Sequence, residues 1–189
     1  MLASLIVTGS LAQTTPYAEV GKPLADFTLN DVQHYSRKVI KGSEFKGQWY
    51  VLDFWNRYCS TCLKKMPLLD SLKREYNGKI NFFLVGYTGS LYTKRSDNKE
   101  IRTLYKRYSR EENLGLAIAY DSVLFHRLDI GTCPFIVVVD PNGIVRLVSS
   151  YISRHQLDDL MAGKEVAFVP VYRREERRLR LQSKEQNSQ

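Results

Sequence analysis

The feature that most constrains the fold is a pair of cysteines, Cys59 and Cys62, which follow closely after an apolar run at residues 50–54. A run that is apolar at nearly every position is typical of a parallel β-strand covered on both faces. After the cysteines the pattern becomes helical, because every third or fourth position from Met66 to Tyr76 is apolar. The sequence therefore predicts a strand, a short turn and a helix, with Cys59 at the helix N-terminus.

Two cysteines in this place suit thiol–disulfide exchange. The free N–H groups and the dipole at a helix N-terminus stabilise a thiolate at Cys59. Cys62 would lie one turn further along, close enough to resolve a mixed disulfide formed at Cys59. The same spacing is also half of a zinc site, so the pair alone leaves two chemistries open. Three cysteines in 189 residues are too few for a disulfide scaffold.

Asp53 interrupts the apolar run with a carboxylate. An ionised group in a dry core costs several kcal/mol unless its pKa rises or it finds partners. One interpretation is a functional acid in the core. The alternative is that strand curvature turns Asp53 to solvent or to a structural hydrogen bond.

The rest of the chain alternates between strand and helix patterns. A polar loop is expected at residues 88–98, and Gly42, Gly47, Gly78 and Gly163 mark turns or helix ends. Further strands are predicted at residues 27–29, 37–40, 48–55, 80–86, 116–120, 135–140 and 144–149. Helices are predicted at residues 62–76, 98–108, 121–127 and 154–161.

A set of residues links these elements to a known family. They are Asp53, Phe54, Trp55, Cys59, Cys62 and Pro67, then Cys133-Pro134, residues 135–140 and Pro141-Asn142-Gly143. Over residues 21–163 the chain resembles the thioredoxin superfamily, and within it the exported TlpA-like and ResA-like thiol–disulfide oxidoreductases. The resemblance implies an α/β, thioredoxin-like fold, with a mixed central sheet, helices on both faces and an extra N-terminal hairpin.

The sequence departs from the family pattern around the cysteine pair. Tyr58 stands where the family usually has tryptophan, and Ser60-Thr61 replaces its usual proline-containing dipeptide. These departures leave the expected fold intact but leave the redox potential open.

The resemblance also implies a role for each catalytic residue. Cys59 attacks as a thiolate, Cys62 resolves the mixed disulfide, and Asp53 accepts and donates the proton of Cys62. Electrons enter and leave through the cysteine pair, so neither an organic cofactor nor a metal is expected.

Four further residues are expected to bind the substrate. In the family the proline that corresponds to Pro134 has a cis peptide bond and sits against the cysteine pair. The backbone of the preceding residue, Cys133, is then free to pair with an extended substrate strand. Trp55 and Tyr58 are expected to form the walls of this site.

Cys133 itself is unexpected, because thioredoxins usually place threonine, valine or isoleucine before this proline. Its plainest interpretation is a small apolar side chain that packs. It could instead tune the redox potential or trap alternative disulfides. A site of three thiolates could also capture a metal or an iron–sulfur cluster.

Composition divides the chain into four parts. Residues 1–12 are apolar and small and fit a signal peptide, with Ser10-Leu11-Ala12 as a cleavage site but without a basic start. The alternative is a mildly apolar disordered end. Residues 13–20 form a linker, residues 21–171 the thioredoxin-like domain, and residues 172–189 a charged tail that could form a frayed helix. With the resemblance, this organisation predicts export to the periplasm or cell envelope.

The net charge of +8 favours solubility and acidic partners, but no nucleic-acid motif accompanies it. The expected partners are protein disulfides and a membrane thiol–disulfide electron donor, and the expected state is a monomer. The predicted function is a thiol–disulfide oxidoreductase that reduces exported proteins. Two alternatives are a peroxiredoxin-like redoxin, whose usual P-x-x-x-T-x-x-C pattern is missing before Cys59, and a non-catalytic binding module with this fold.

Overall fold

The computed structural model describes residues 17–186. The predicted signal peptide and the first part of the predicted linker lie outside these residues. Among the described helices, none is both long enough and apolar enough to cross a membrane.

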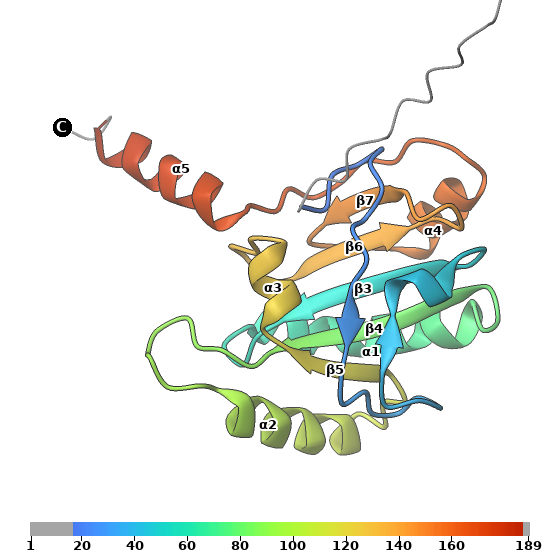
Figure 1. Cartoon of the computed structure of the whole chain (residues 1–189), viewed down its shortest axis with the longest axis horizontal. Coiled ribbons are helices and arrows are strands. Elements are labelled where there is room, and N and C mark those ends of the chain that lie inside the picture. The colour runs from blue at the N-terminus through green and yellow to red at the C-terminus, as the bar shows by residue number, and fades with distance from the viewer. Residues whose placement is uncertain (1–16, 187–189) are drawn as a thin grey trace, which may run out of the picture.

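The molecule is built on a five-stranded mixed sheet with the strand order β5-β4-β3-β6-β7 (Figure 1). Its strands are β3 (Trp49–Trp55), β4 (Ile80–Tyr87), β5 (Ala117–Asp121), β6 (Phe135–Val139) and β7 (Val145–Ser149). The neighbours β3, β4 and β5 run parallel, whereas β6 is antiparallel to both β3 and β7. Strand β3 is central and covered on both faces, which is why nearly all of its residues are apolar.

Three helices cover one face of the sheet. They are α1 (Ser60–Glu75), α2 (Asn98–Glu111) and α4 (Arg154–Met161). Their apolar faces join Val51 and Trp55 of β3 in one hydrophobic cluster. Helix α1 begins two residues earlier than predicted because Cys59 acts as its N-cap, and α2 extends three residues further than predicted.

The other face carries smaller elements. They are the hairpin of β1 (Thr28–Leu29) and β2 (Ile40–Lys41), the 3-10 turn Gly42–Phe45, and α3 (Val123–Arg127). Phe45 and Phe125 pack there with Phe54 in a second cluster. The predicted hairpin is confirmed, although its second strand begins three residues later than predicted, at Ile40. The thioredoxin-like sheet with helices on both faces is likewise confirmed.

The last helix, α5 (Arg174–Gln186), lies within the predicted charged tail. In Figure 1 it projects away from the sheet, and only its start approaches the body of the molecule near α3. An isolated β-bridge between Ile130 and Arg173 fixes that start.

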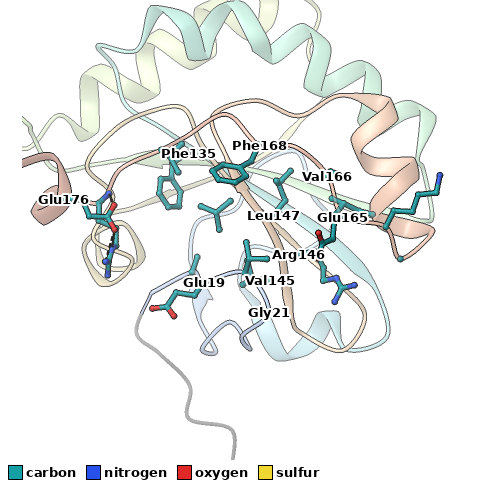
Figure 2. Close-up of a pocket in the computed structure, with 18 residues that line it drawn as sticks. Glu19, Gly21, Phe135, Val145, Arg146, Leu147, Glu165, Val166, Phe168 and Glu176 are labelled. Atoms are coloured by element: carbon teal, nitrogen blue, oxygen red, sulfur yellow. Dashed lines mark hydrogen bonds and ion pairs between the residues drawn. The ribbon is translucent and has the colours of Figure 1, made fainter. Parts of the chain in front are cut away.

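The largest cavity described lies along the edge strand β7 and has a volume of about 730 Å³. Figure 2 shows Val145 and Leu147 of β7 beneath Phe168, with Glu19 and Gly21 of the N-terminal segment on one side. None of the three cysteines lines this cavity. Size alone therefore does not locate the reactive chemistry of the molecule.

Candidate active site

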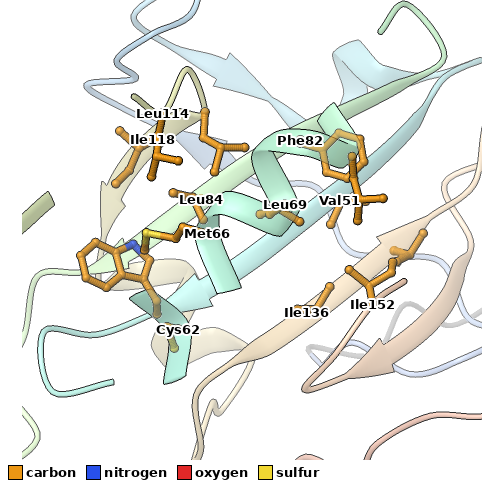
Figure 3. Close-up of a cluster of buried hydrophobic side chains, with 14 of the residues drawn as sticks. Val51, Cys62, Met66, Leu69, Phe82, Leu84, Leu114, Ile118, Ile136 and Ile152 are labelled. Carbon is orange, nitrogen blue, oxygen red and sulfur yellow. The ribbon is translucent and has the colours of Figure 1, made fainter. Parts of the chain in front are cut away.

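Cys59 and Cys62 are joined by a disulfide bond at the start of α1. The backbone N–H of Cys62 donates to Sγ of Cys59 at 3.1 Å, so the first sulfur takes the place of an N-cap oxygen. In Figure 3, Cys62 lies at the first turn of the helix, and Met66 and Leu69 follow it toward the sheet. The prediction that Cys59 lies at the helix N-terminus is confirmed.

The two sulfurs differ in their access to solvent. The exposed fraction is 9% for Cys59 and 1% for Cys62. Cys59 lines a cavity of about 220 Å³ together with Tyr58 and Cys133, whereas Cys62 does not reach it. A partner molecule can therefore reach Cys59 from the cavity, whereas Cys62 is not accessible to it.

Asp53 lies on β3 between Val51 and Trp55, whose side chains belong to the cluster beneath α1. Because side chains alternate along a strand, Asp53 faces the same helix. Its exposed fraction is 4%, and Oδ1 is buried without a hydrogen-bond partner. Burial raises the pKa of Asp53 to about 7, and the positive charge of Lys65 on α1 opposes the rise.

These observations exclude the alternative that Asp53 turns to solvent. A carboxyl group that titrates near neutral pH can both accept and release a proton under ordinary conditions. The apolar run around Asp53 correctly predicted a buried position, and its catalytic role stays a prediction.

The peptide bond between Cys133 and Pro134 is cis, as the resemblance implied. Cys133 is half-buried, packs against both hydrophobic clusters and is a free thiol. Burial raises the pKa of its thiol to about 12, although a hydrogen bond with Asn56 opposes the rise. Cys133 is therefore a neutral thiol at physiological pH. Within residues 17–186, no group of three or more His, Cys, Asp or Glu side chains is arranged to hold a metal ion.

The two aromatic residues expected to form the walls lie in different places. Tyr58 is 41% exposed and lines the Cys59 cavity, where its ring meets Tyr92 edge-on at 4.7 Å between centroids. Trp55 is fully buried and packs against Tyr105 in the core beneath α1. The structure thus places Tyr58 at the cavity, whereas Trp55 is not among the residues that line it. Pro134 is also buried beside the cavity lining.

Sequence reasoning missed several residues that line the cavity, among them Asn56, Tyr92 and Arg177. Asn56 accepts a hydrogen bond from the Tyr58 N–H at 2.9 Å and contacts the Cys133 thiol, so it connects the two loops of the site. Its position between the strand end and the cysteine pair was a signal that could have been used. Tyr92 and Arg177 come from a distant loop and from α5, and no local pattern places them there.

An ion pair holds the loop between β3 and α1 in place. Nε of Arg57 lies 3.0 Å from Oδ1 of Asp97, which is buried at the start of α2. The guanidinium also hydrogen-bonds to the Tyr58 hydroxyl and lies 4.4 Å from its ring centroid. The position of Tyr58 therefore depends on a residue almost forty positions further along the chain.

Comparisons with known proteins agree with this geometry. The chain is 29% identical over 123 residues to the chloroplastic protein Suppressor of Quenching 1 of Arabidopsis thaliana, an alignment that covers 63% of this chain and 11% of that protein. It is 23% identical to the thiol-disulfide oxidoreductase ResA of Geobacillus kaustophilus, over 76% of this chain and 75% of that protein. The chain thus spans only about a tenth of the Arabidopsis relative.

Solved structures share the fold. A secreted disulfide oxidoreductase of Mycobacterium tuberculosis superposes with a TM-score of 0.53 and 19% identity, covering 72% of this chain and 95% of that one. At this identity the likeness shows the fold alone. The model of the AhpC/TSA family matches residues 20–148, which include β3, the cysteine pair and Pro134. The chain therefore belongs to the AhpC/TSA family.

Proposed function

We propose that this chain is a thiol–disulfide oxidoreductase that reduces disulfides in other proteins. One observation carries the proposal: a disulfide at a helix N-terminus has one sulfur in an open cavity and the other buried, with the unpartnered acid Asp53 on the adjoining strand. The names of the relatives, among them ResA, support the same reaction class.

The reaction starts from the dithiol form. The thiolate of Cys59 attacks one sulfur of a substrate disulfide, and the other substrate sulfur leaves as a thiolate. Asp53 takes the proton of Cys62, whose sulfur then attacks Sγ of Cys59. The substrate sulfur that was bonded to Cys59 then leaves as a thiolate, and the Cys59–Cys62 disulfide forms. Two electrons pass from the dithiol to the substrate, and the proton held by Asp53 is released to the departing thiolate or to water.

The substrate strand binds beside Cys59. Cys133 and Tyr58 line the cavity, and no described residue hydrogen-bonds to the backbone N–H or C=O of Cys133. An extended substrate could therefore pair with that backbone. Pro134 holds the turn, and Trp55 supports the site from the core rather than by contact with substrate.

We also infer that the protein works outside the cytoplasm. One structural neighbour is described as secreted, and the composition of the first residues fits an export signal. Because exported compartments are oxidising, the disulfide formed at each turnover must be reduced again by a dithiol donor, for which a membrane protein is suitable.

The test is turnover of a protein disulfide, such as those of insulin, in the presence of a small thiol. Cys59→Ser should abolish the reaction. Cys62→Ser should stop turnover but leave a mixed disulfide with the substrate, which mass spectrometry detects. A chain that still turns over without Cys59, or that binds insulin without reducing it, contradicts the proposal. A faster reaction with hydrogen peroxide than with insulin would favour the redoxin alternative.

The direction of electron flow is tested by the reduction potential of the cysteine pair. A potential near roughly −270 mV suits a reductase, whereas one near roughly −120 mV indicates an oxidant. Cys133→Ser should be measured alongside. A shift of roughly 30 mV or more, equivalent to about 1.4 kcal/mol, would assign Cys133 to the redox site, and an unchanged potential would assign it to packing.

A further inference from the structure

The segment after Val171 is docked on the loop that precedes Pro134. The N–H of Gly131 donates to the carbonyl of Tyr172 at 3.1 Å, and the N–H of Tyr172 donates to Oγ1 of Thr132 at 3.2 Å. The N–H of Arg174 donates to the carbonyl of Asp129 at 2.8 Å. The start of α5 is therefore held by backbone hydrogen bonds to the loop that leads into the site.

Gly131 permits this close approach. A Cβ atom at this position would lie 2.5 Å from the backbone carbonyl carbon of Arg173, closer than atoms can pack. The side chain of Arg174 adds a hydrogen bond from Nε to the carbonyl of Ile130 at 3.1 Å. A residue without a side chain thus stands where the C-terminal segment crosses the loop.

This docking places the basic side of α5 beside the cysteine cavity. Nη1 of Arg177 donates to the carbonyl of Gly131 at 3.2 Å, and Arg177 also lines the cavity that contains Cys59. A second cavity, of about 570 Å³, shares Thr132 and Arg177 with the first. The two cavities are therefore neighbours along one side of the site.

The lining of both cavities is positive. The second one is lined by Thr132, Tyr172, Arg177, Arg180, Leu181, Ser183 and Lys184, and no carboxylate is among the described residues that line either cavity. Of the acidic residues at the start of α5, Glu175 lies near Arg178, and Glu176 binds Arg173 and also feels the charge of Arg180. Among the described residues, the lining of the two cavities thus includes Arg177 and Arg180 but no carboxylate.

We propose that α5 forms a substrate subsite that selects protein disulfides with acidic residues close to the reacting cysteine. This inference rests on the proposed function. An extended substrate strand beside Cys133 would leave the Cys59 cavity past Thr132 and Arg177. Carboxylates a few residues from the substrate cysteine would then meet Arg177 and Arg180. Attraction between opposite charges raises the rate of encounter and fixes the register of the bound strand.

The test compares two peptide disulfides that differ only in two flanking residues, which are both glutamate in one and both lysine in the other. The reduced full-length chain should reduce the acidic peptide about fivefold faster or more in kcat/KM at low salt, as expected for two partly exposed ion pairs. Raising the salt concentration from 50 to 500 mM should remove most of the difference, because exposed charges are screened.

Arg180→Gln should reduce the preference toward onefold, because Arg180 is one of the two cations proposed to meet the substrate carboxylates. Its side chain is exposed, so the fold should persist, which circular dichroism can check. Arg178→Gln is the matched control, because Arg178 lies on the same helix but lines neither cavity. Its preference should equal that of the wild type.

A small neutral disulfide, hydroxyethyl disulfide, distinguishes a failure of the subsite from a failure of the proposed function. If the wild type reduces it and both peptides at equal rates, the subsite is overturned and the proposed function stands. If the wild type reduces none of the three, the proposed function fails and the subsite fails with it. Binding of α5 to vesicles of anionic lipid, with no preference between the peptides, would also overturn the inference and assign the basic residues to a membrane surface.

Discussion

Two buried carboxylates, Asp53 and Asp70, lie in the layer between the sheet and α1, yet their surroundings are opposite. Asp70, on α1, is 2% exposed and fully partnered: Oδ1 accepts the N–H of Gly115 at 2.9 Å, and Oδ2 forms an ion pair with Arg74 one turn along the helix. Asp53, on β3, is equally buried, but its Oδ1 has no hydrogen-bond partner.

The difference separates an acid held by structural partners from an acid without a partner at Oδ1. Asp70 compensates for its burial by connecting α1 to the loop before β5, and its removal would leave the Gly115 N–H without a partner. Asp53 makes no such connection and remains a source of instability when ionised. The lack of a partner supports the proton-transfer role that we propose for Asp53.

The largest expected effect is on activity. Asp53→Asn keeps the shape of the side chain but removes the group that we propose accepts the proton of Cys62, so disulfide reduction at pH 7 should fall by about 100-fold. Asp70→Asn, the matched control, should stay within about twofold of the wild type. The measurement is single-turnover kinetics of the reduced protein with a peptide disulfide. Equal losses in both variants would mean that the two acids do not differ in role.

The second prediction concerns stability, for which Asp70→Asn should have the larger effect and Asp53→Asn the smaller one. Asp70→Asn should lower the free energy of unfolding by about 1–3 kcal/mol, because it weakens a charged hydrogen bond and the partly exposed pair with Arg74. Asp53→Asn should cost nothing at pH 8 and should stabilise the oxidised protein, because it replaces an unpartnered buried charge. Urea titrations of both oxidised variants test the ranking, and a large loss of stability in Asp53→Asn would show that its carboxylate has a partner after all.

The third prediction is a dependence of stability on pH that Asp53 contributes and that Asp53→Asn should remove. Its pKa is about 7 in the folded protein against an ordinary value of 3.8, so between these values the folded state holds a proton that the unfolded state has lost. The contribution of Asp53 is therefore fully present below about pH 4 and is lost as the pH rises to about 7. The slope should reach about −1.4 kcal/mol per pH unit.

The measurement is the difference in unfolding free energy between wild type and Asp53→Asn at several pH values from 4 to 8. The difference should move in favour of the variant as the pH rises and should then level off. A difference that is flat over this range would mean that Asp53 is ionised throughout, and its role as a proton acceptor near neutral pH would be lost.

The comparison of the two acids also shows where sequence reasoning succeeds. Asp53 stands out because the pattern around it is continuous and apolar, so the exception and the nearby cysteines could be found from neighbours in the chain. The central strands, the turn at Gly143 and the helix at Arg154–Met161 follow from similarly local patterns.

Contacts between segments that are far apart in the sequence could not be predicted from local patterns. The ion pair of Arg57 with Asp97 and the docking of Arg177 at Gly131 join segments that are far apart in sequence. Gly131 could be seen as a glycine in a loop, but the chain that passes over it belongs to the tail. The burial of Trp55 also depends on α2, which comes fifty residues later. A charged tail therefore gave no indication that it borders the active site.

The smallest expected effect concerns Lys65, the cation that opposes the raised pKa of Asp53. Its Nζ donates to the carbonyl of Ser150 at 3.0 Å and lies 5.1 Å from the ring centroid of Tyr151, so it is held on the sheet side of α1. Lys65→Met removes the charge, and the pKa of Asp53 should rise further. The acid is then ionised at higher pH, so the rising limb of the pH–rate profile should move to higher pH. At pH 7 the rate should fall by about two- to fivefold, far less than in Asp53→Asn.

Lys64→Met, at the exposed neighbouring position, is the control and should leave the profile unchanged. If Lys65→Met lowers the rate equally at every pH, then Lys65 acts through packing, and the electrostatic link between α1 and Asp53 is not part of the mechanism.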